Sequence, residues 1–261
     1  MTLVFGFSFA PWHQANLWDE RYECYSFIEK GLMLANVGLY RCDLIIDDRP
    51  LTAFQIGAVA TRPEYRNQGL AGTLLNFVLE RYSQAPLFLF ANENMLDFYP
   101  RFGFHRIYES RPTLERQTSN KPARAMKVRP DDPLVEHYLN NGRLCSRRFY
   151  CKNGRSLEHF HLLLSYPDSI YHLPEQDALV VAQVIDDSLF VPYLNAPEAA
   201  DYERLFQDLP FSGPNLRFGF MPDQKLVRLR WSIDLGDEEP MFVRGKFPLP
   251  EPFTFPAMAK T

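Results

Sequence analysis

The fold is decided by the stretch Val59-Ala60-Thr61-Arg62-Pro63-Glu64-Tyr65-Arg66-Asn67-Gln68-Gly69-Leu70-Ala71-Gly72. An apolar run, Phe54 to Thr61, predicts a strand before the turn, and a leucine-rich run, Leu70 to Tyr82, predicts a helix after it. A strand that opens into a helix through a short turn presents several unpaired backbone N–H groups at one point. Those donors and the positive end of the helix dipole form an anion site, and such a site suits a diphosphate.

Small and basic side chains in the turn favour a phosphate ligand. Gly69 lets the backbone approach the ligand with no Cβ in the way, and Ala71 is the next-smallest residue. Arg66 adds a fixed positive charge and a forked set of donors. An ordinary strand–turn–helix with a capping glycine is the alternative interpretation of the same residues.

The turn resembles the acetyl-CoA pyrophosphate loop of the GNAT N-acetyltransferases, because Arg66-x-x-Gly69-x-Ala71 follows a strand that ends in Val59-Ala60-Thr61. The resemblance implies a GNAT acyl-CoA N-acyltransferase fold, of α/β class with a mixed sheet, and acetyl-CoA as co-substrate. It implies cofactor contacts from Val59, Ala60, Thr61, Arg66, Asn67, Gln68, Gly69, Leu70, Ala71 and Gly72.

A second stretch, Asn92 to Phe104, resembles the family motif N-x-x-A-x-x-L-Y-x-x-x-G-F, with Met95 and Phe98 in place of a small and an aliphatic residue. The resemblance implies that Asn92 holds the pantetheine arm of the cofactor. It also implies that Tyr99 lies next to the sulfur and acts as the general acid. The alternative for Tyr99 is an amphipathic residue that closes a short helix over the core.

Further elements around these motifs are predicted from periodicity and turn residues. The pair Asp47-Asp48 predicts a solvated hairpin turn before Pro50. A short helix is expected over Gln14 to Tyr25. Strands are expected at Ser26 to Ala35, Gly38 to Ile46, Leu51 to Thr61 and Leu87 to Ala91.

The chain is predicted to contain two units. Residues 1–112 form the GNAT domain, residues 113–132 a linker rich in turn signals, and residues 133–261 a smaller, degenerate GNAT-like α/β domain. The second unit repeats the order hairpin, helix, strand, with no glycine-bearing loop. Helices are expected at Pro133 to Asn140, Ser156 to Leu164 and Ala196 to Leu209, the last capped by Asn195. A hairpin is expected at Ala178 to Ile185 and Ser188 to Leu194. Further strands are expected at Leu216 to Phe220, Val227 to Ile233 and Met241 to Phe247.

The proline-rich tail, Phe247 to Pro256, cannot form a helix or a central strand. Its interleaved phenylalanines predict an arm that docks on the body, and a polyproline ligand for another protein is the alternative. His159 and His161 lie in a predicted helix without a third ligand at a standard spacing, so no metal site is expected.

Composition limits the partners and the compartment. The 261 residues carry a formal net charge of -4, which gives no argument for nucleic acid or an anionic membrane. The four cysteines have no C-x-x-C spacing and predict free thiols in a reducing cytoplasm. No apolar run is long enough to cross a bilayer. Homo-oligomerisation stays open.

The general base is not identifiable from the sequence. Gln55 stands where some family members have Glu, and Glu29 is a second candidate. Two-module relatives, the aminoglycoside-acetylating enhanced-survival proteins, use a C-terminal carboxylate, which makes Thr261 a third. Those relatives have a sterol-carrier-like module that the chain is too short to include.

The sequence thus predicts an N-acetyltransferase that moves an acetyl group from acetyl-CoA to an amine on a small molecule or peptide. A non-catalytic acyl-CoA-binding or scaffolding protein is the alternative, favoured by the missing base and the short N-terminal region. A protein-interaction module that uses the Pro/Phe tail is a third interpretation.

Overall fold

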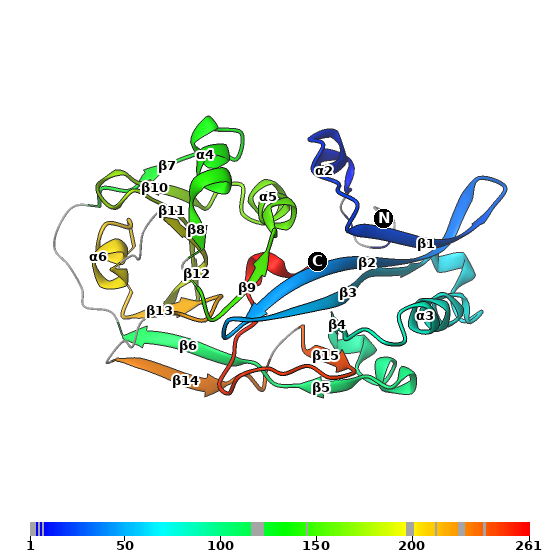
Figure 1. The fold of residues 1–261 in the computed structure, drawn as a ribbon. Helices are drawn as coiled ribbons and strands as arrows, with labels where there is room; N and C mark the ends of the chain where they lie inside the picture. The colour runs from blue at the N-terminus through cyan, green and yellow to red at the C-terminus, as the bar shows by residue number, and fades with distance from the viewer. Residues whose placement is uncertain are drawn as a thin grey trace.

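The computed structural model describes residues 4, 6, 8–115, 123–144, 146–196, 201–211, 213–223, 228–236 and 239–261. Within these residues, two mixed sheets of seven and eight strands form the body, and helices lie on their faces (Figure 1). The α/β class and the mixed sheets agree with the sequence prediction.

The seven-stranded sheet contains the predicted strand–turn–helix. Its order is β1-β2-β3-β4-β15-β5, and β9 pairs with β2. β3 runs parallel to β4, and the connection between them includes helix α3 (Leu70–Arg81), which buries Leu74, Leu75 and Val78 against the sheet. The strands are β1 (Tyr22–Glu29), β2 (Leu32–Ile46), β3 (Arg49–Thr61), β4 (Leu87–Phe90), β5 (His105–Ile107), β9 (Phe149–Lys152) and β15 (Met241–Arg244).

Two tight hairpin turns shape this sheet. Asp47 and Asp48 have φ values of 44° and 62°, so the predicted turn is confirmed in a left-handed form that Asp tolerates. A second turn at Lys30 and Gly31, with φ values of 48° and 79°, divides the segment that was expected to be one strand from Ser26 to Ala35.

The N-terminal helix prediction is wrong over most of its length. Helix α2 covers only Ala10–Gln14, and the chain is already extended at Tyr22, where β1 begins. The residues of β1 alternate between the two faces of the sheet and pair with β2. This strand pairing outweighs the weak helical period.

The eight-stranded sheet has the order β14-β6-β13-β12-β11-β10-β7, and β8 pairs with β12. Helices α4 (Pro133–Asn141) and α5 (Arg155–Leu164) are confirmed near their predicted positions. The strands are β6 (Ser110–Glu115), β7 (Met126–Lys127), β8 (Arg143–Leu144), β10 (Ile170–Leu173), β11 (Ala178–Ile185), β12 (Ser188–Ala196), β13 (Asn215–Phe218) and β14 (Leu229–Ile233).

The predicted internal repeat is present in the pairing. The hairpin β2–β3, helix α3 and parallel strand β4 correspond to the hairpin β11–β12, helix α6 (Tyr202–Gln207) and parallel strand β13. The predicted helix from Ala196 to Leu209 is wrong at its start, because Ala196 and its expected cap Asn195 belong to β12. Asp201 caps α6 instead and accepts from the Arg204 N–H, and residues 197–200 lie outside the described residues.

The two sheets exchange strands, and this differs from the predicted boundaries. β6 crosses the expected boundary at residue 112 and lies between β13 and β14 of the second sheet. β15, which was assigned to the second unit, lies between β4 and β5 of the first sheet. The reason is that each sheet is completed by a strand from the other part of the sequence. The predicted linker over residues 113–132 therefore begins too early, because β6 continues to Glu115. Residues 116–122 lie outside the described residues.

The C-terminal arm docks on the body, as the interleaved phenylalanines predict. Phe253 and Phe255 are buried, and the Phe255 ring contacts those of Phe88, Phe90 and Phe149. Beyond it, the short 3₁₀ helix η5 (Ala257–Ala259) lies between β9, α5 and the first sheet (Figure 1). The arm thus fills the junction between the two sheets.

Candidate functional site

Strand β3 separates from β4 halfway along its length. The two strands pair only where Phe54 to Ile56 face Leu87 to Leu89. From Gly57 to Thr61, β3 pairs with β2 alone among the described residues. Backbone groups on the β4 side of this segment are therefore available to an extended ligand.

A β-bulge sits at the point of separation. Ala58 has a φ of 48°, and the pairing of β2 with β3 shifts between Asn36 and Gly38. The buried Asn36 amide donates to the Ala58 carbonyl at 3.0 Å, and the Ser26 hydroxyl donates to the Asn36 oxygen at 2.7 Å. This short chain of hydrogen bonds stabilises the left-handed backbone at Ala58.

We expect Asn36→Ala to lower the free energy of unfolding by about 1–3 kcal/mol, because it leaves the Ala58 carbonyl and the Ser26 hydroxyl without their partner. Urea unfolding measures this loss. Asn94→Ala, at an exposed position, is the control and should change stability by less than about 0.5 kcal/mol. Equal effects in the two variants would contradict the role of Asn36.

The turn after β3 leaves a set of N–H groups unpaired. The 3₁₀ helix η1 (Pro63–Tyr65) leads to Asn67 and Gly69, with φ values of 62° and 78°, and Gly69 is the N-cap of α3. No side chain caps α3, and the described residues provide no acceptor for the N–H groups of residues 67–72. Gly69 is exposed, and no atom lies within 4 Å of where its Cβ would stand. The predicted anion site is therefore open and unfilled by the protein itself.

Arg66 lies beside this turn. Its Nε donates to the Thr61 carbonyl at 3.4 Å, and its side chain is exposed. That hydrogen bond holds the base of the guanidinium at the end of β3.

Tyr99 lies at the start of η3 (Tyr99–Phe102), on the side of the first sheet that α3 covers. Its ring contacts Phe98, Phe104 and Phe242, and only 6% of the residue is exposed. Burial raises the pKa of Tyr99 to about 12. The phenol therefore keeps its proton at neutral pH and is available as a donor.

Asn92 lies directly after β4 and has a local role in the structure. Its side-chain oxygen accepts from the Asn94 N–H at 3.1 Å and caps η2 (Glu93–Met95). Instead of one helix through Tyr99, the chain forms two separate 3₁₀ helices, η2 and η3, with Pro100 in the first turn of η3. The break agrees with the fixed φ of proline and its missing N–H.

Two of the three candidate bases, Gln55 and Thr261, lie together, and Glu29 lies apart from them. Gln55 is buried on β3, and Thr261 lies against it and against Gly57, whose Cβ would come within 2.7 Å of the Thr261 hydroxyl. With its amide oriented to satisfy both groups, Gln55 donates to the Ala259 carbonyl at 3.1 Å and accepts from the Thr261 N–H at 2.7 Å. Glu29 is exposed at the tip of the β1–β2 hairpin, beyond the end of β3.

A polar network that the sequence did not suggest fixes the arm beside β3. Glu109 accepts from the Phe255 N–H at 2.7 Å and from the Lys260 ammonium at 3.2 Å. His161 donates from Nε2 to the Lys260 carbonyl at 2.7 Å. Burial lowers the pKa of His161 to about 4, so its imidazole is neutral at pH 7. Contacts between residues 100 to 150 positions apart leave no local signal in a sequence.

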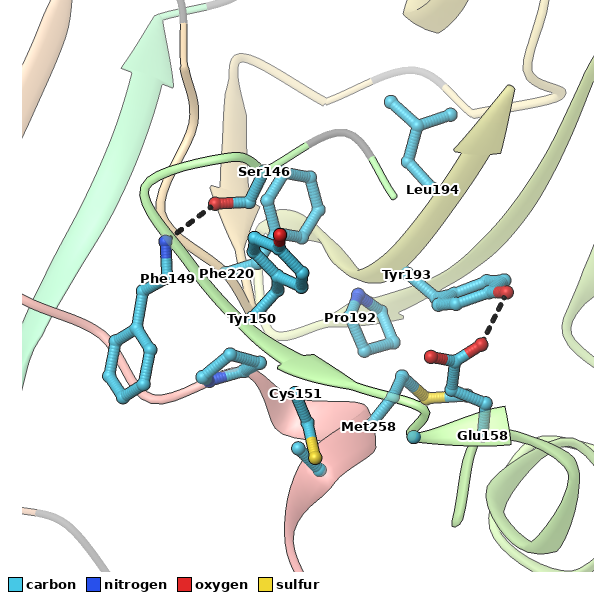
Figure 2. A pocket seen from close by; sticks show the side chains of 13 residues that line it. Ser146, Phe149, Tyr150, Cys151, Glu158, Pro192, Tyr193, Leu194, Phe220 and Met258 are labelled. Carbon is cyan, nitrogen blue, oxygen red and sulfur yellow. Dashed lines mark hydrogen bonds between the residues drawn. The ribbon is translucent and has the colours of Figure 1, made fainter. Parts of the chain in front are cut away.

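A buried carboxyl lies on the opposite side of the arm (Figure 2). Glu158 of α5 accepts from the Tyr193 hydroxyl at 3.0 Å, and that hydroxyl accepts from the Asn195 amide at 2.7 Å. Burial raises the pKa of Glu158 to about 7, and the Tyr193 hydrogen bond opposes this rise.

This raised pKa makes stability depend on pH in a defined direction. The folded protein binds the Glu158 proton more tightly than the unfolded chain, whose carboxyl has the ordinary pKa of 4.5. The contribution is therefore full below about pH 4.5 and is lost as the pH rises through about 7. The difference corresponds to about 3 kcal/mol.

We expect Glu158→Gln, which keeps a neutral side chain at every pH, to gain about 3 kcal/mol relative to the wild type between pH 4.5 and pH 8. Urea unfolding across this range measures the difference. The exposed Glu136 on α4 provides the matched control, Glu136→Gln, which should show no such gain. Parallel curves for the wild type and Glu158→Gln would contradict the raised pKa.

No group of three or more His, Cys, Asp or Glu side chains that could hold a metal ion is present among the residues that the structure describes. His159 and His161 both lie on α5, as predicted, and His161 is engaged by the arm. In the described part of the chain, no helix has the length and apolar character needed to span a bilayer.

Comparison with protein families agrees with this geometry. Residues 2–107 match the family model described as acetyltransferase (GNAT) domain. The matched residues include β1 to β5 and the turn before α3. No curated protein sequence matches the chain.

Three solved structures share the fold over most of the chain at low identity. A probable N-acyltransferase from Enterococcus faecalis is 14% identical, with a TM-score of 0.57 over 93% of this chain and 67% of its own. A GCN5-related N-acetyltransferase from Anabaena variabilis is 12% identical, with a TM-score of 0.56 over 93% and 68%. Eis1 from Mycobacterium abscessus is 14% identical, with a TM-score of 0.54 over 87% and 65%. The chain thus spans about two thirds of their lengths.

Proposed function

We propose that this protein transfers an acetyl group from acetyl-CoA to an amine, and the match of residues 2–107 to the acetyltransferase (GNAT) family model supports the proposal. The observation that carries the proposal is the open set of N–H groups around Gly69, which follows the segment of β3 that pairs with β2 and has left β4. A diphosphate at the turn and an extended thioester chain along β3 would use both features. The protein would act in the cytoplasm, in keeping with the free thiols of Cys24, Cys42 and Cys151.

The cofactor would bind in two parts. Arg66 and the N–H groups of residues 67–72 would hold the diphosphate, and the backbone of Val59, Ala60 and Thr61 would pair with the pantetheine arm. Asn92, two residues after β4, would contact that arm through its side-chain NH₂ group, which the capping bond to Asn94 does not use.

The reaction needs three events at the thioester. The nitrogen of a neutral amine attacks the carbonyl carbon, and a C–N bond forms while the negative charge moves to the oxygen. A backbone N–H of β3 stabilises this oxyanion. When the C–S bond breaks, Tyr99 gives its proton to the departing thiolate. The surplus proton of the amine leaves for solvent, and Tyr99 regains a proton from solvent before the next turnover. Thr261 lies against Gly57, and we propose that it faces the acceptor.

Titration calorimetry with acetyl-CoA, and separately with free CoA, tests the cofactor site. Thiol release in the presence of a panel of small amines and peptides then tests turnover. We expect saturable binding of both ligands and amine-dependent release of CoA. Binding without turnover on any amine would support the alternative, a non-catalytic acyl-CoA-binding protein. No binding at millimolar ligand would overturn both.

A further inference from the structure

A small, partly open cavity lies between the two sheets, where β9 faces β12 (Figure 2). It has a volume of about 30 Å³, and β9, α5, β12 and the C-terminal arm provide its walls. A buried water occupies roughly 10–15 Å³ of such space, so the cavity accommodates about two or three non-hydrogen atoms.

The walls are almost entirely apolar or aromatic. The rings of Tyr150, Tyr193 and Phe220 line the cavity, together with Pro192 and the thioether of Met258. Among the residues that the structure describes, no lysine or arginine lines it. Faces of aromatic rings attract organic cations, and the attraction strengthens where water is excluded.

One acidic side chain, Glu158, lines this apolar cavity. One oxygen of Glu158 accepts from Tyr193, and Figure 2 shows the other turned towards Pro192 and Met258. The described residues provide no hydrogen bond or cation to that second oxygen. A carboxylate at such a place needs either a proton or a positive charge.

We propose that the cavity binds a small primary ammonium ion, with its charge on the free oxygen of Glu158 and its alkyl part among the aromatic rings. Methylammonium, with two non-hydrogen atoms, matches the space. A metal ion fits poorly, because Mg²⁺ and Ca²⁺ require several oxygen ligands and the cavity offers a single free carboxylate oxygen.

The site is separate from the proposed acetyl-CoA site, and one residue of η5 links them. Ala259 lines the cavity, and its carbonyl accepts from Gln55 on β3. Occupation of the cavity would therefore stabilise the arm where it meets β3.

Other titratable groups near Glu158 do not provide the missing charge. His161 lies one turn further along α5, and its neutral ring is bonded to the Lys260 carbonyl. His159, on the same helix, has a pKa lowered by burial. On β9, Cys151 and Tyr150 carry no positive charge, and on the arm Lys260 is paired with Glu109. On β12, Tyr193 is a donor to the carboxyl.

Titration of the full chain with methylammonium chloride, followed by saturation-transfer NMR on the ligand methyl group, tests the proposal. Sodium chloride keeps the ionic strength constant. At pH 8 we expect saturable binding. At pH 5.5 the affinity should fall about thirty-fold, because a carboxyl with a pKa of about 7 is mostly protonated there while the ammonium keeps its charge.

Glu158→Gln should abolish binding, and Glu136→Gln, at an exposed position of α4, should leave it unchanged. Circular dichroism and acetyl-CoA titration show that each variant is folded, and they do so independently of the cavity. Saturable binding that persists in Glu158→Gln would overturn the proposal. So would the absence of saturation in the wild type at pH 8 with up to about 100 mM methylammonium at constant ionic strength. Either result would leave the acetyltransferase proposal intact.

Discussion

Gly69→Glu is expected to lower the affinity for acetyl-CoA at least about 100-fold, a loss of about 2.7 kcal/mol. Gly69 has a φ of 78° and begins α3, so a side chain there would stand among the unpaired N–H groups of the turn. A carboxylate at this point would repel the diphosphate and take up the donors that should bind it. Titration calorimetry of the variant with acetyl-CoA measures the loss.

Gly31→Glu is a closely matched control. Gly31 has a φ of 79°, and no atom lies within 4 Å of where its Cβ would stand, so the substitution adds the same charge and the same backbone strain in open space. Gly31 lies in the β1–β2 turn. The affinity of the Gly31→Glu variant for acetyl-CoA should stay within about two-fold of the wild type. Wild-type affinity of Gly69→Glu for acetyl-CoA would contradict the proposed cofactor site around Gly69.

Tyr99→Phe is expected to lower kcat about 100-fold while the affinity for acetyl-CoA changes less than about two-fold. The variant keeps the ring that contacts Phe98, Phe104 and Phe242, and it loses only the proton that the thiolate would take. Because the pKa of Tyr99 is raised to about 12, the wild-type rate should show no loss from Tyr99 ionisation up to about pH 10. Thiol-release kinetics across pH measure both effects.

Tyr82→Phe serves as the control for loss of a hydroxyl. Tyr82 follows α3 at the end away from Gly69, and its hydroxyl donates to Glu23 at 2.9 Å. Its kcat should stay near the wild-type value. An unchanged kcat in Tyr99→Phe, with chemistry shown to limit the rate, would remove Tyr99 from the acid role.

The local features of the first unit could be predicted from the sequence because short-range chemistry specifies them. The apolar run gives β3, leucine spacing gives α3, and Asp47-Asp48 gives the hairpin turn, which the structure shows in a left-handed form. The same rules identify the second hairpin around Asp186. Where neighbouring residues alone decide the backbone, the prediction agrees with the structure.

The sequence also failed at identifiable points. Gln14 to Tyr25 has aromatic residues that suit a helix or a strand, and pairing with β2 selects the strand from Tyr22 onward. Asn195 has the chemistry of a helix cap, yet it lies in β12, where its amide bonds to Tyr193 and to the Tyr138 carbonyl. Both outcomes depend on partners that are distant in sequence.

The sequence by itself determined the strand–turn–helix, the open N–H groups around Gly69 and the docking of the proline-rich tail, since each follows from residue type and spacing. Only the tertiary structure decided the exchange of β6 and β15 between the sheets, the pKa of Tyr99 and Glu158, and the contact of the arm with Gln55. Burial and long-range pairing set all three. They depend on the packing of segments that are distant in sequence, and no local pattern encodes them.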